Sequence, residues 1–260
     1  MTSAASTARR ALITGANTGI GRAIAFGLAE AGIDILVHHL GDADGAQSVA
    51  DGIAALGRNA ETLELDLSDT ASLSKWARAL AAGPSPVDIL ILNAAVEFRS
   101  DWTALDEAAI GRHVAVNFTA SIVLAQTLVP EMARRGWGRI VAVGSILAER
   151  PRSETLVYAS LKSAQLTAMR SIARSVAADG VTVNVVSPGS ILTERSRKAL
   201  SDEVVRRGVE AKIPVGRIGR PEDCVAPVAM LCSDAAAYIT GANIPVDGGW
   251  HIGDAMEAVR

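Results

Sequence analysis

Short apolar runs alternate with longer segments of helical periodicity along the whole chain. Seven runs are candidate strands: 11–14, 33–37, 61–67, 87–92, 139–143, 181–186 and 243–246. Several of these runs are apolar almost without interruption, which is typical of strands that are buried on both faces of a sheet. The connections between them are roughly 20 to 40 residues long, which is enough for a crossover helix and favours parallel pairing.

Six segments repeat apolar residues at helical spacing. They lie near 19–31, 43–56, 69–81, 104–134, 157–179 and 221–233. The alternation of strand and helix predicts one α/β domain: a doubly wound, mostly parallel seven-stranded sheet with helices on both faces. We expect this domain to span 9–260, after a disordered tail at 1–8. The charged segment 190–216 has the loosest pattern, and it predicts either a mobile substrate lid or a solvated surface helix.

Composition narrows the class of protein. The chain has 260 residues, of which 49% are hydrophobic and 20% charged, and this balance argues against disorder. The net charge is −3 and no basic run is present, so we expect no nucleic-acid partner. No apolar stretch approaches the roughly 20 residues of a membrane helix, and the N-terminus lacks the apolar core of a signal peptide. We therefore expect a cytoplasmic protein that does not bind membranes.

Cysteine and histidine suggest neither a disulfide nor a metal site. Cys224 and Cys232 are eight residues apart in one apolar helical stretch, too far for a disulfide, and resemble small core residues. The four histidines show no metal-ligand spacing. We therefore expect no metal.

The stretch "ALITGANTGIGRAIAFGLAEAG" reads as a strand, a glycine-rich turn and a helix. Its glycines are Gly15, Gly19 and Gly21, a spacing that differs from G-x-G-x-x-G but can perform the same task. Glycines allow the backbone to approach a pyrophosphate closely, and the N-terminus of the following helix favours an anion. The turn predicts a dinucleotide site; the alternative is a tight turn with no ligand.

Four polar residues form a candidate proton-transfer site. Tyr158 and Lys162 are four residues apart, so a helix places them on one face, where the ammonium can lower the phenol pKa from its usual value of about 10. Ser145 follows the run 139–143, at the end of a strand where open sheets bind ligands, and no histidine is placed to make it a nucleophile. Asn117 is unusual in an apolar helix. Taken singly, each has a structural explanation: a core tyrosine with an accidental lysine, a capping serine, a solvent-facing asparagine.

These motifs together resemble the classical short-chain dehydrogenases/reductases. "TGANTGIG" is similar to their T-G-x-x-x-G-x-G, "LNAAV" to N-N-A-G, and "SPGSILT" to P-G-x-I-x-T, and the order of Asn117, Ser145, Tyr158 and Lys162 also agrees. "LDLSD" (65–69) and "ITGANIPVDGG" (239–249) extend the likeness over nearly the whole chain. The resemblance implies a Rossmann fold and an NAD(P)-dependent alcohol dehydrogenase or carbonyl reductase in which Tyr158 is the general acid/base and Asn117 helps to hold a water that links Lys162 to solvent.

The resemblance also implies the cofactor contacts. These are Gly15, Asn17, Thr18, Gly19, Ile20, Gly21, His39, Leu40, Asp66, Leu67, Asn93, Ala94, Ala95, Tyr158, Lys162, Pro188, Gly189, Ile191 and Thr193. Asp66 is expected to bond the adenine, Asn93 and Ala94 to flank the nicotinamide ribose, and Ile191 and Thr193 to hold the carboxamide. Ala95 stands where the family usually has glycine, which narrows the groove.

The choice between NAD and NADP depends on the end of the second strand. His39 stands where NAD-preferring relatives carry Asp, and Leu40 where many NADP-preferring relatives carry Arg. Asp42 reaches the ribose only if its loop folds back. Because no strong cation is evident, we expect NAD or NADP with a slight preference for NAD.

The substrate is expected to be a small alcohol or carbonyl compound: a sugar or polyol, a 3-oxoacyl thioester or a cyclic ketone. Expected substrate contacts are Ser145, Val96, Glu97, Ile146, Arg150, Arg152 and Ser190. Arg150 and Arg152 suggest a polar or anionic substrate, unless they are only solvated loop charges. The apolar patterns at 104–134 and 157–179, with the family resemblance, predict a homotetramer. The alternatives are a cofactor-binding regulator that lost the chemistry, and an epimerase or dehydratase with retained NAD.

Overall fold

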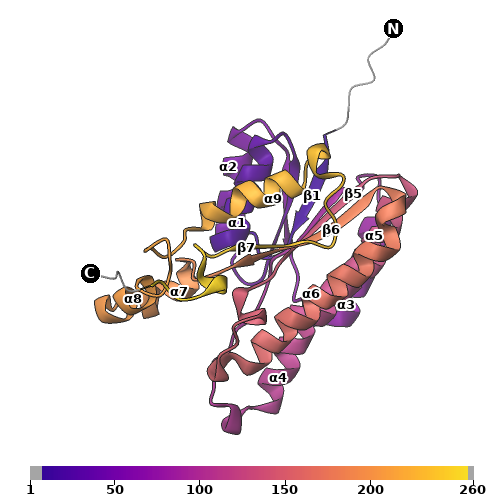
Figure 1. The fold of residues 1–260 in the computed structure, drawn as a ribbon. Coiled ribbons are helices and arrows are strands. Elements are labelled where there is room, and N and C mark those ends of the chain that lie inside the picture. The colour runs from indigo at the N-terminus through magenta and orange to yellow at the C-terminus, as the bar shows by residue number, and fades with distance from the viewer. Residues whose placement is uncertain (1–7, 257–260) are drawn as a thin grey trace.

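The computed structural model describes residues 8–256, and its centre is one seven-stranded sheet (Figure 1). The strands are β1 (Arg10–Ile13), β2 (Asp34–His39), β3 (Ala60–Glu64), β4 (Ile89–Leu92), β5 (Gly138–Val143), β6 (Val181–Pro188) and β7 (Asn243–Val246). Their order is β3-β2-β1-β4-β5-β6-β7, and every neighbouring pair is parallel. The predicted doubly wound sheet is confirmed, although it is all parallel rather than mostly parallel. The tail expected at 1–8 lies, except for residue 8, outside the described residues.

Helices cover both faces of the sheet. They are α1 (Gly19–Glu30), α2 (Ala43–Ala55), α3 (Thr70–Ala81), α4 (Glu107–Val114), α5 (Ala120–Arg134), α6 (Leu156–Val176), α7 (Glu194–Leu200), α8 (Glu203–Glu210) and α9 (Val225–Leu231). In Figure 1, α1, α2 and α9 lie on one side of the strands, and α3, α5 and α6 lie on the other. The side chains that each group of helices contributes to the two cores agree with this division.

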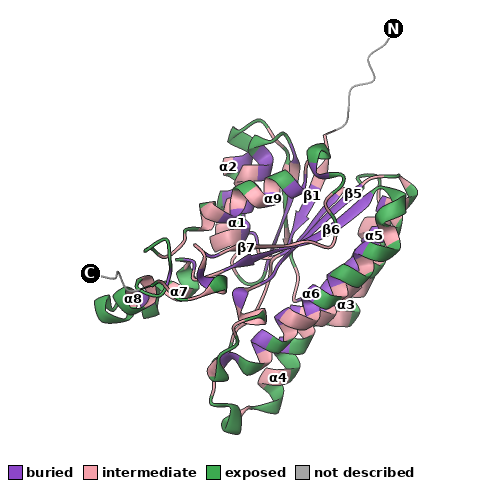
Figure 2. Ribbon diagram, viewed as in Figure 1, coloured by how far each residue is buried: buried purple, intermediate pink, exposed green. Residues whose placement is uncertain are grey.

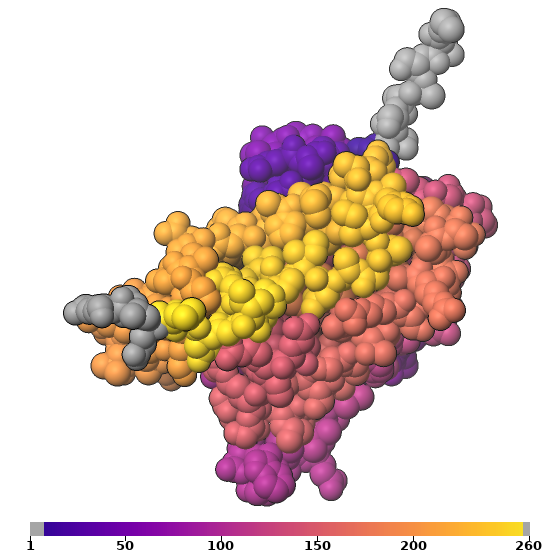
Figure 3. Space-filling view, in the orientation of Figure 1, coloured from indigo at the N-terminus to yellow at the C-terminus, as the bar shows by residue number. Residues whose placement is uncertain are grey.

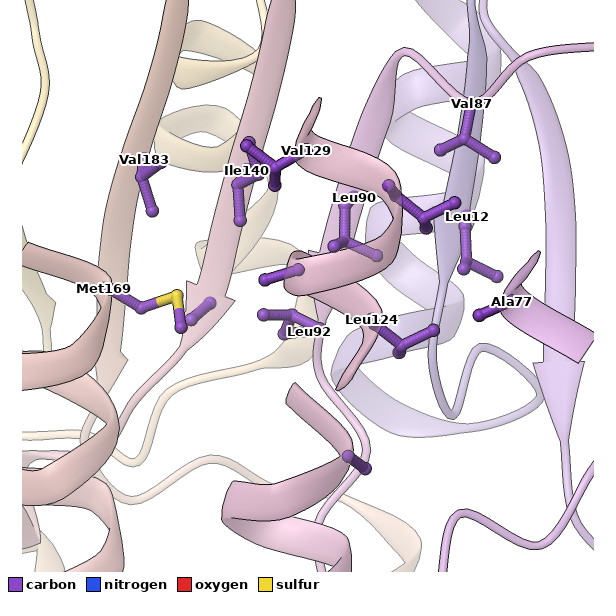
Figure 4. Close-up of a cluster of buried hydrophobic side chains, with 14 of the residues drawn as sticks. Leu12, Ala77, Val87, Leu90, Leu92, Leu124, Val129, Ile140, Met169 and Val183 are labelled. Carbon is purple, nitrogen blue, oxygen red and sulfur yellow. The ribbon is translucent and has the colours of Figure 1, made fainter. Parts of the chain in front are cut away.

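The sheet separates two hydrophobic cores. One contains Leu12, Leu90 and Ile140 from the strands and is closed by Leu124 and Met169 from the helices (Figure 4). The other contains neighbouring residues of the same strands, because successive side chains of a strand point to opposite faces. Burial is therefore continuous along the central strands β4, β5 and β6, whereas the edge strand β3 is partly exposed, and the outer helix surfaces and many loops are exposed (Figure 2). This double burial explains the uninterrupted apolar runs in the sequence.

The chain order reverses between β1 and β4. β1 pairs with β2 on one side and with β4 on the other, so the connections leave in opposite directions from this point. Such a switch point leaves a crevice at the carboxyl ends of the strands, where open α/β sheets bind their ligands. The glycine-rich turn follows β1 and Asn93 follows β4, so both meet at this crevice.

The segment 190–216 forms two short helices rather than one. α7 begins after Thr193, and α8 begins after Asp202, whose carboxylate accepts hydrogen bonds from the backbone N–H groups of Val204 and Val205. In Figure 3, this orange region lies against the yellow C-terminal part of the chain. Whether the segment moves as a lid stays a prediction.

The longest helical stretch corrects one expectation. α4, a π-helical turn (Ala115–Thr119) and α5 run together over Glu107–Arg134, which is long and apolar enough to cross a membrane by length and composition alone. The expectation that no stretch approaches that length was wrong, because Glu107 and Arg112 interrupt the apolar run only near its start. Yet α5 packs on α3 and contributes Leu124 and Leu128 to the core, and a core helix passes the same test.

Candidate active site

The glycine-rich turn forms a narrow cradle. Gly15 and Gly19 have φ values of +64° and +53°, a region that L side chains rarely adopt. A Cβ on Gly21 would overlap the Gly15 carbonyl oxygen and the Asn93 amide, and a Cβ on Gly19 would come within 3.2 Å of Thr193 Cγ2. The turn therefore faces Thr193 across a gap that a side chain would fill.

Asn93 fastens the turn to the end of β4. Its Nδ2 donates to the carbonyl oxygens of Thr14 (2.8 Å) and Gly15 (3.0 Å). In return, Thr14 Oγ1 accepts the backbone N–H groups of Asn93 (2.9 Å) and Ala94 (3.0 Å). The Asn93 side chain thus holds the protein's own turn, and the contact with a ribose implied by the resemblance stays a prediction.

His38 is a turn-supporting residue that the sequence did not reveal. Its Nδ1 accepts the backbone N–H of Gly15 at 3.0 Å, and its Nε2 bonds the Leu65 carbonyl oxygen at 2.9 Å. Because an acceptor faces Gly15, the proton must be on Nε2. Burial lowers the pKa of His38, which favours this neutral form. The available signal was its position next to His39 on β2, because successive side chains of a strand point to opposite faces.

His39 lies at the expected discriminating position. It is buried, and its Nδ1 has no hydrogen-bond partner among residues 8–256. A buried polar nitrogen without a partner costs free energy unless a ligand or water satisfies it. Leu40, the next residue, is exposed, as expected for a side chain at the rim of the site.

Asp42 folds back onto the glycine turn. Its Oδ2 accepts from Asn17 Nδ2 at 2.7 Å, and its Oδ1 caps α2 by accepting from Gly45 N–H at 3.1 Å. The hydrogen bond from Asn17 is the main reason that the pKa of Asp42 lies below its ordinary value. A fixed carboxylate therefore lies beside the turn, next to Asn17.

The segment after β3 is divided between surface and core. Asp66 Oδ1 accepts from Ser68 N–H and Oγ at 2.8 and 2.7 Å, and these bonds lower the Asp66 pKa. The Leu67 side chain belongs to the core, and the cofactor contact implied for this residue by the resemblance stays a prediction. Thr18 lies at the N-terminus of α1 without a side-chain cap, and Ile20 packs partly against the core.

Tyr158, on α6, is buried beneath the loops of the site. The pKa of its phenol is raised to about 12, mainly by burial and also by Glu97, while Arg195 and the hydroxyl of Ser145 act in the opposite direction. No hydrogen bond joins the Tyr158 and Ser145 hydroxyls in the described chain, although the backbone N–H of Leu147 bonds Ser145 Oγ at 3.2 Å. The expected lowering of the phenol pKa is therefore not found in the protein alone.

Lys162 lies on the same face of α6, with Nζ 5.6 Å from the Tyr158 ring centroid. The ammonium donates to the Val143 carbonyl oxygen at 2.6 Å and to Gln165 Oε1 at 3.2 Å. Burial lowers its pKa to about 7, and repulsion from Arg195 contributes. Burial therefore disfavours the charged form of Lys162, and its hydrogen bonds to Val143 and Gln165 favour it.

Asn117 clamps the loop that follows β4. It lies in the π-helical turn, a type of distortion that is frequent at functional sites. Its Oδ1 accepts from Val96 N–H and its Nδ2 donates to the Val96 carbonyl oxygen, both at 2.8 Å. One helical turn earlier, His113 Nε2 accepts from Phe98 N–H at 3.1 Å. The buried Asn117 is therefore satisfied by protein, and it fixes the strip that holds Val96 and Glu97.

The opposite wall of the crevice comes from the end of β6. Pro188 ends the strand, and Gly189 has no space for a Cβ because Asp247 lies against it. Ile191 forms a bridge with Gly219, whose N–H bonds the Ser190 carbonyl oxygen at 2.9 Å. Arg195, which the sequence did not single out, reaches across to the Ala95 carbonyl oxygen at 3.4 Å. The Arg195–Ala95 contact therefore joins the two walls, and Arg195 lies near enough to Tyr158 and Lys162 to affect the pKa of both.

A cleft of about 550 Å³ opens beside the Ser145 loop. Three of the expected substrate residues, Ile146, Arg150 and Arg152, line it. Its wall also includes Leu147, Lys212, Trp250 and Asp254. Arg152 lies over the Trp250 ring, 5.3 Å from its centroid, and Arg150 pairs with Asp254 at 2.8 Å. Val96, Glu97 and Ser190 are not among the residues that line it.

The fold and this constellation define a class of nicotinamide-dependent oxidoreductases. A family model described as Enoyl-(Acyl carrier protein) reductase matches residues 15–251. The chain belongs to the short-chain dehydrogenase/reductase family, and it is an NAD(P)-dependent dehydrogenase/reductase.

Three relatives are similar over nearly their whole length. L-rhamnose 1-dehydrogenase (NAD(P)(+)) of Sphingomonas sp. (strain SKA58) is 35% identical, over 93% of this chain and 95% of the relative. The 3-oxoacyl-[acyl-carrier-protein] reductase FabG of Escherichia coli (strain K12) is 36% identical, over 93% and 97%. The crystal structure of a putative NAD(P)-dependent gluconate 5-dehydrogenase from Beutenbergia cavernae, with bound NADP at low occupancy, has a TM-score of 0.88 and 38% identity, over 93% and 96%.

The residues of this chain fit the NAD(P) that the class requires. The cradle at Gly15, Gly19 and Gly21 leaves the space that a pyrophosphate needs, and it leads into the N-terminus of α1. The unpartnered Nδ1 of the buried His39 lies at the end of β2, where the ribose of a dinucleotide binds in this architecture.

Proposed function

We propose that this protein interconverts a secondary alcohol and a ketone, with Tyr158 as the general acid/base. The observation that carries the proposal is the buried Tyr158 phenol, with Lys162 one helical turn away and Ser145 close enough to affect its pKa. Bound NAD(P) supplies or accepts the hydride. In reduction, Tyr158 Oη–H donates its proton to the carbonyl oxygen of the substrate; in oxidation, the same oxygen takes the hydroxyl proton.

The other polar residues support this proton transfer. Ser145 Oγ holds the substrate oxygen, and Asn117 fixes the strip at Val96 while its backbone lies in the distorted turn that would hold a relay water. With a phenol pKa of about 12, Tyr158 carries its proton at neutral pH until the cationic nicotinamide or a charged Lys162 stabilises the phenolate. The protein alone is therefore poised as a proton donor.

We propose a cofactor site along the crevice. The residues that form it are Gly15, Asn17, Thr18, Gly19, Ile20, Gly21, His39, Leu40, Asp66, Leu67, Asn93, Ala94, Ala95, Tyr158, Lys162, Pro188, Gly189, Ile191 and Thr193. A preference for NAD is favoured by the Asp42 carboxylate, which lies against Asn17 and repels a 2′-phosphate. The NADP in the gluconate 5-dehydrogenase structure is a property of that relative, and measured cofactor constants decide for this chain.

A sugar acid is the substrate class that the cleft supports best. Among the seven residues named for its wall, Arg150, Arg152 and Lys212 are cationic and only Asp254 is anionic. Arg150 is already paired with Asp254, which leaves Arg152 and Lys212 to face a carboxylate. Two of the relatives act on sugars or sugar acids by name, and the third acts on 3-oxoacyl thioesters, which we keep as the second candidate.

The experiment is a panel of paired substrates, read at 340 nm with NAD and NADP. Each aldonic acid is paired with the polyol of the same stereochemistry, and 3-oxoacyl thioesters are included. Lys212→Ala should raise KM for the acids about fivefold, the effect of one exposed charge, and leave the polyols unchanged. Lys198→Ala, an exposed lysine on α7 outside the cleft wall, is the control. Turnover of thioesters alone would overturn the sugar-acid assignment.

Assembly and location complete the proposal. A homotetramer is supported by Glu107–Arg134, whose most apolar window is only 39% buried within one chain, so apolar surface remains for a partner. Light scattering on the eluted protein tests it, and a mass of 26.9 kDa would contradict it. A cytoplasmic location is supported by the two cysteines, which are buried and unpaired.

A further inference from the structure

Gln165 is a buried amide one helical turn from Lys162. The side chain is 2% exposed, and both of its ends have partners: Oε1 accepts from Lys162 Nζ at 3.2 Å, and Nε2 donates to Ser121 Oγ at 3.0 Å. Its neighbours on α6, Leu166 and Met169, are core residues, so an apolar side chain would fit this position by environment. Burying an amide is costly without full hydrogen bonding, and here that bonding is directed at the ammonium.

The ammonium determines which end of the amide faces it, and Ser121 holds the other end. A lysine ammonium only donates, so only the oxygen of Gln165 can be its partner. The amide nitrogen then points to α5, where the hydroxyl of Ser121 accepts its proton. Ser121 lies four residues after Asn117, so the contact joins the Asn117 helix to the lysine of the site.

We propose that Gln165, oriented by Ser121, is a positioning residue that keeps the ammonium of Lys162 charged and fixed beside the Tyr158 phenol. The proposal rests on the proton-transfer role given to Tyr158 and Lys162 above. Gln165 itself touches neither substrate nor phenol; it acts through Lys162.

The surroundings of Lys162 explain why a neutral acceptor matters. Burial lowers the Lys162 pKa to about 7, and Arg195, from α7, opposes the charged form. Tyr158 on the same helix is itself protonated, and Glu97, from the loop after β4, acts on the phenol. No ion pair involves Lys162 within the described residues, so the two oxygen acceptors at Val143 and Gln165 are what favour the charge.

The first test measures Lys162 directly and without catalysis. The chain has only four lysines, Lys75, Lys162, Lys198 and Lys212, so ε-¹³C-lysine NMR resolves them, and Lys162→Arg assigns the signal. Gln165→Met should lower the titration midpoint of Lys162 by about one pH unit, and Gln165→Glu should raise it. Gln126→Met, an exposed glutamine on α5, should leave it unchanged.

The second test follows the pH profile of kcat/KM. The alkaline limb should move to lower pH in Gln165→Met and, less far, in Ser121→Ala, whereas Ser121→Thr should restore the wild-type profile. A Lys162 midpoint that stays the same in both Gln165→Met and Gln165→Glu would overturn the proposal. Turnover that survives Tyr158→Phe would instead overturn the proposed function, so the two failures are distinguishable.

Discussion

Asn17 Nδ2 donates to Asp42 Oδ2 at 2.7 Å, so the glycine turn and the start of α2 share one carboxylate. A charge in this place acts on whatever occupies the ribose end of the crevice. The proposed preference for NAD rests on this carboxylate, since the chain has no Asp at the end of β2.

Asp42→Asn tests this charge. The amide keeps an oxygen that can accept from Asn17 and cap α2, but it removes the repulsion of a 2′-phosphate. We expect KM for NADP to fall about fivefold and KM for NAD to change little, since one exposed charge contributes about 1 kcal/mol at contact distance. Initial rates with both cofactors measure the change. Asp44→Asn, on the first turn of the same helix, is the matched control, and an equal effect there would contradict the assignment.

Gly21→Ala tests the cradle. The new Cβ would overlap the Gly15 carbonyl oxygen, which is backbone and cannot move aside cheaply. We expect cofactor binding to weaken at least tenfold and the free energy of unfolding to fall by about 1–3 kcal/mol. Gly111→Ala on α4 has open space around it and should instead stabilise the protein by about 0.4–1 kcal/mol. Calorimetric titration and urea unfolding distinguish the two variants.

His38 makes stability depend on pH. Its pKa in the folded protein lies below the ordinary value of 6.5, so the unfolded chain binds a proton first as the pH falls. Stability is therefore complete above pH 6.5 and is lost below it. His38→Asn, which keeps an acceptor toward Gly15, should show a smaller loss of unfolding free energy between pH 7 and 5. Parallel slopes for the two proteins would argue against a role for His38.

Lys162 is expected to serve activity at a cost in stability. Its folded pKa of about 7 lies below the ordinary 10.5, so the unfolded chain holds more protons between these values and stability rises with pH across this window. Lys162→Met should abolish turnover, raise the unfolding free energy at pH 7 by about 0.5–2 kcal/mol, and remove the rise toward pH 10. Urea unfolding at pH 7, 8.5 and 9.5 checks this, and a destabilised variant would contradict it.

The strands of the sheet could be predicted from the sequence because burial on both faces leaves a local mark, an uninterrupted apolar run. β4 and β6 are buried on both faces, so their apolar runs predict them directly, and all seven strands form close to the expected positions. The exposed segment 190–216 has no such constraint, and its two helices are marked mainly by the caps at Thr193 and Asp202.

The site was predictable where one residue type performs one task, and not where long-range contacts decide. The glycines of the turn are recognisable in the sequence, because a positive φ, as at Gly15 and Gly19, disfavours other residues. His38, Arg195 and Gln165 act through partners 23, 100 and 44 positions away, and no spacing in the sequence marks such pairs. The sequence also could not show that burial raises the phenol pKa in the protein alone, since the degree of burial of Tyr158 is a property of the packed molecule.

Arg150 ties the C-terminal segment to the loop that begins at Ser145. Its guanidinium bonds the Trp250 carbonyl oxygen and the Asp254 carboxylate, so these C-terminal residues support the wall of the cleft beside the Ser145 loop. Substitution of Arg150 would remove both contacts, so it is expected to loosen the loop that begins at Ser145. The C-terminal segment is thus a brace for the Ser145 loop, although the bonded residues lie 100 and 104 positions from Arg150 in the chain.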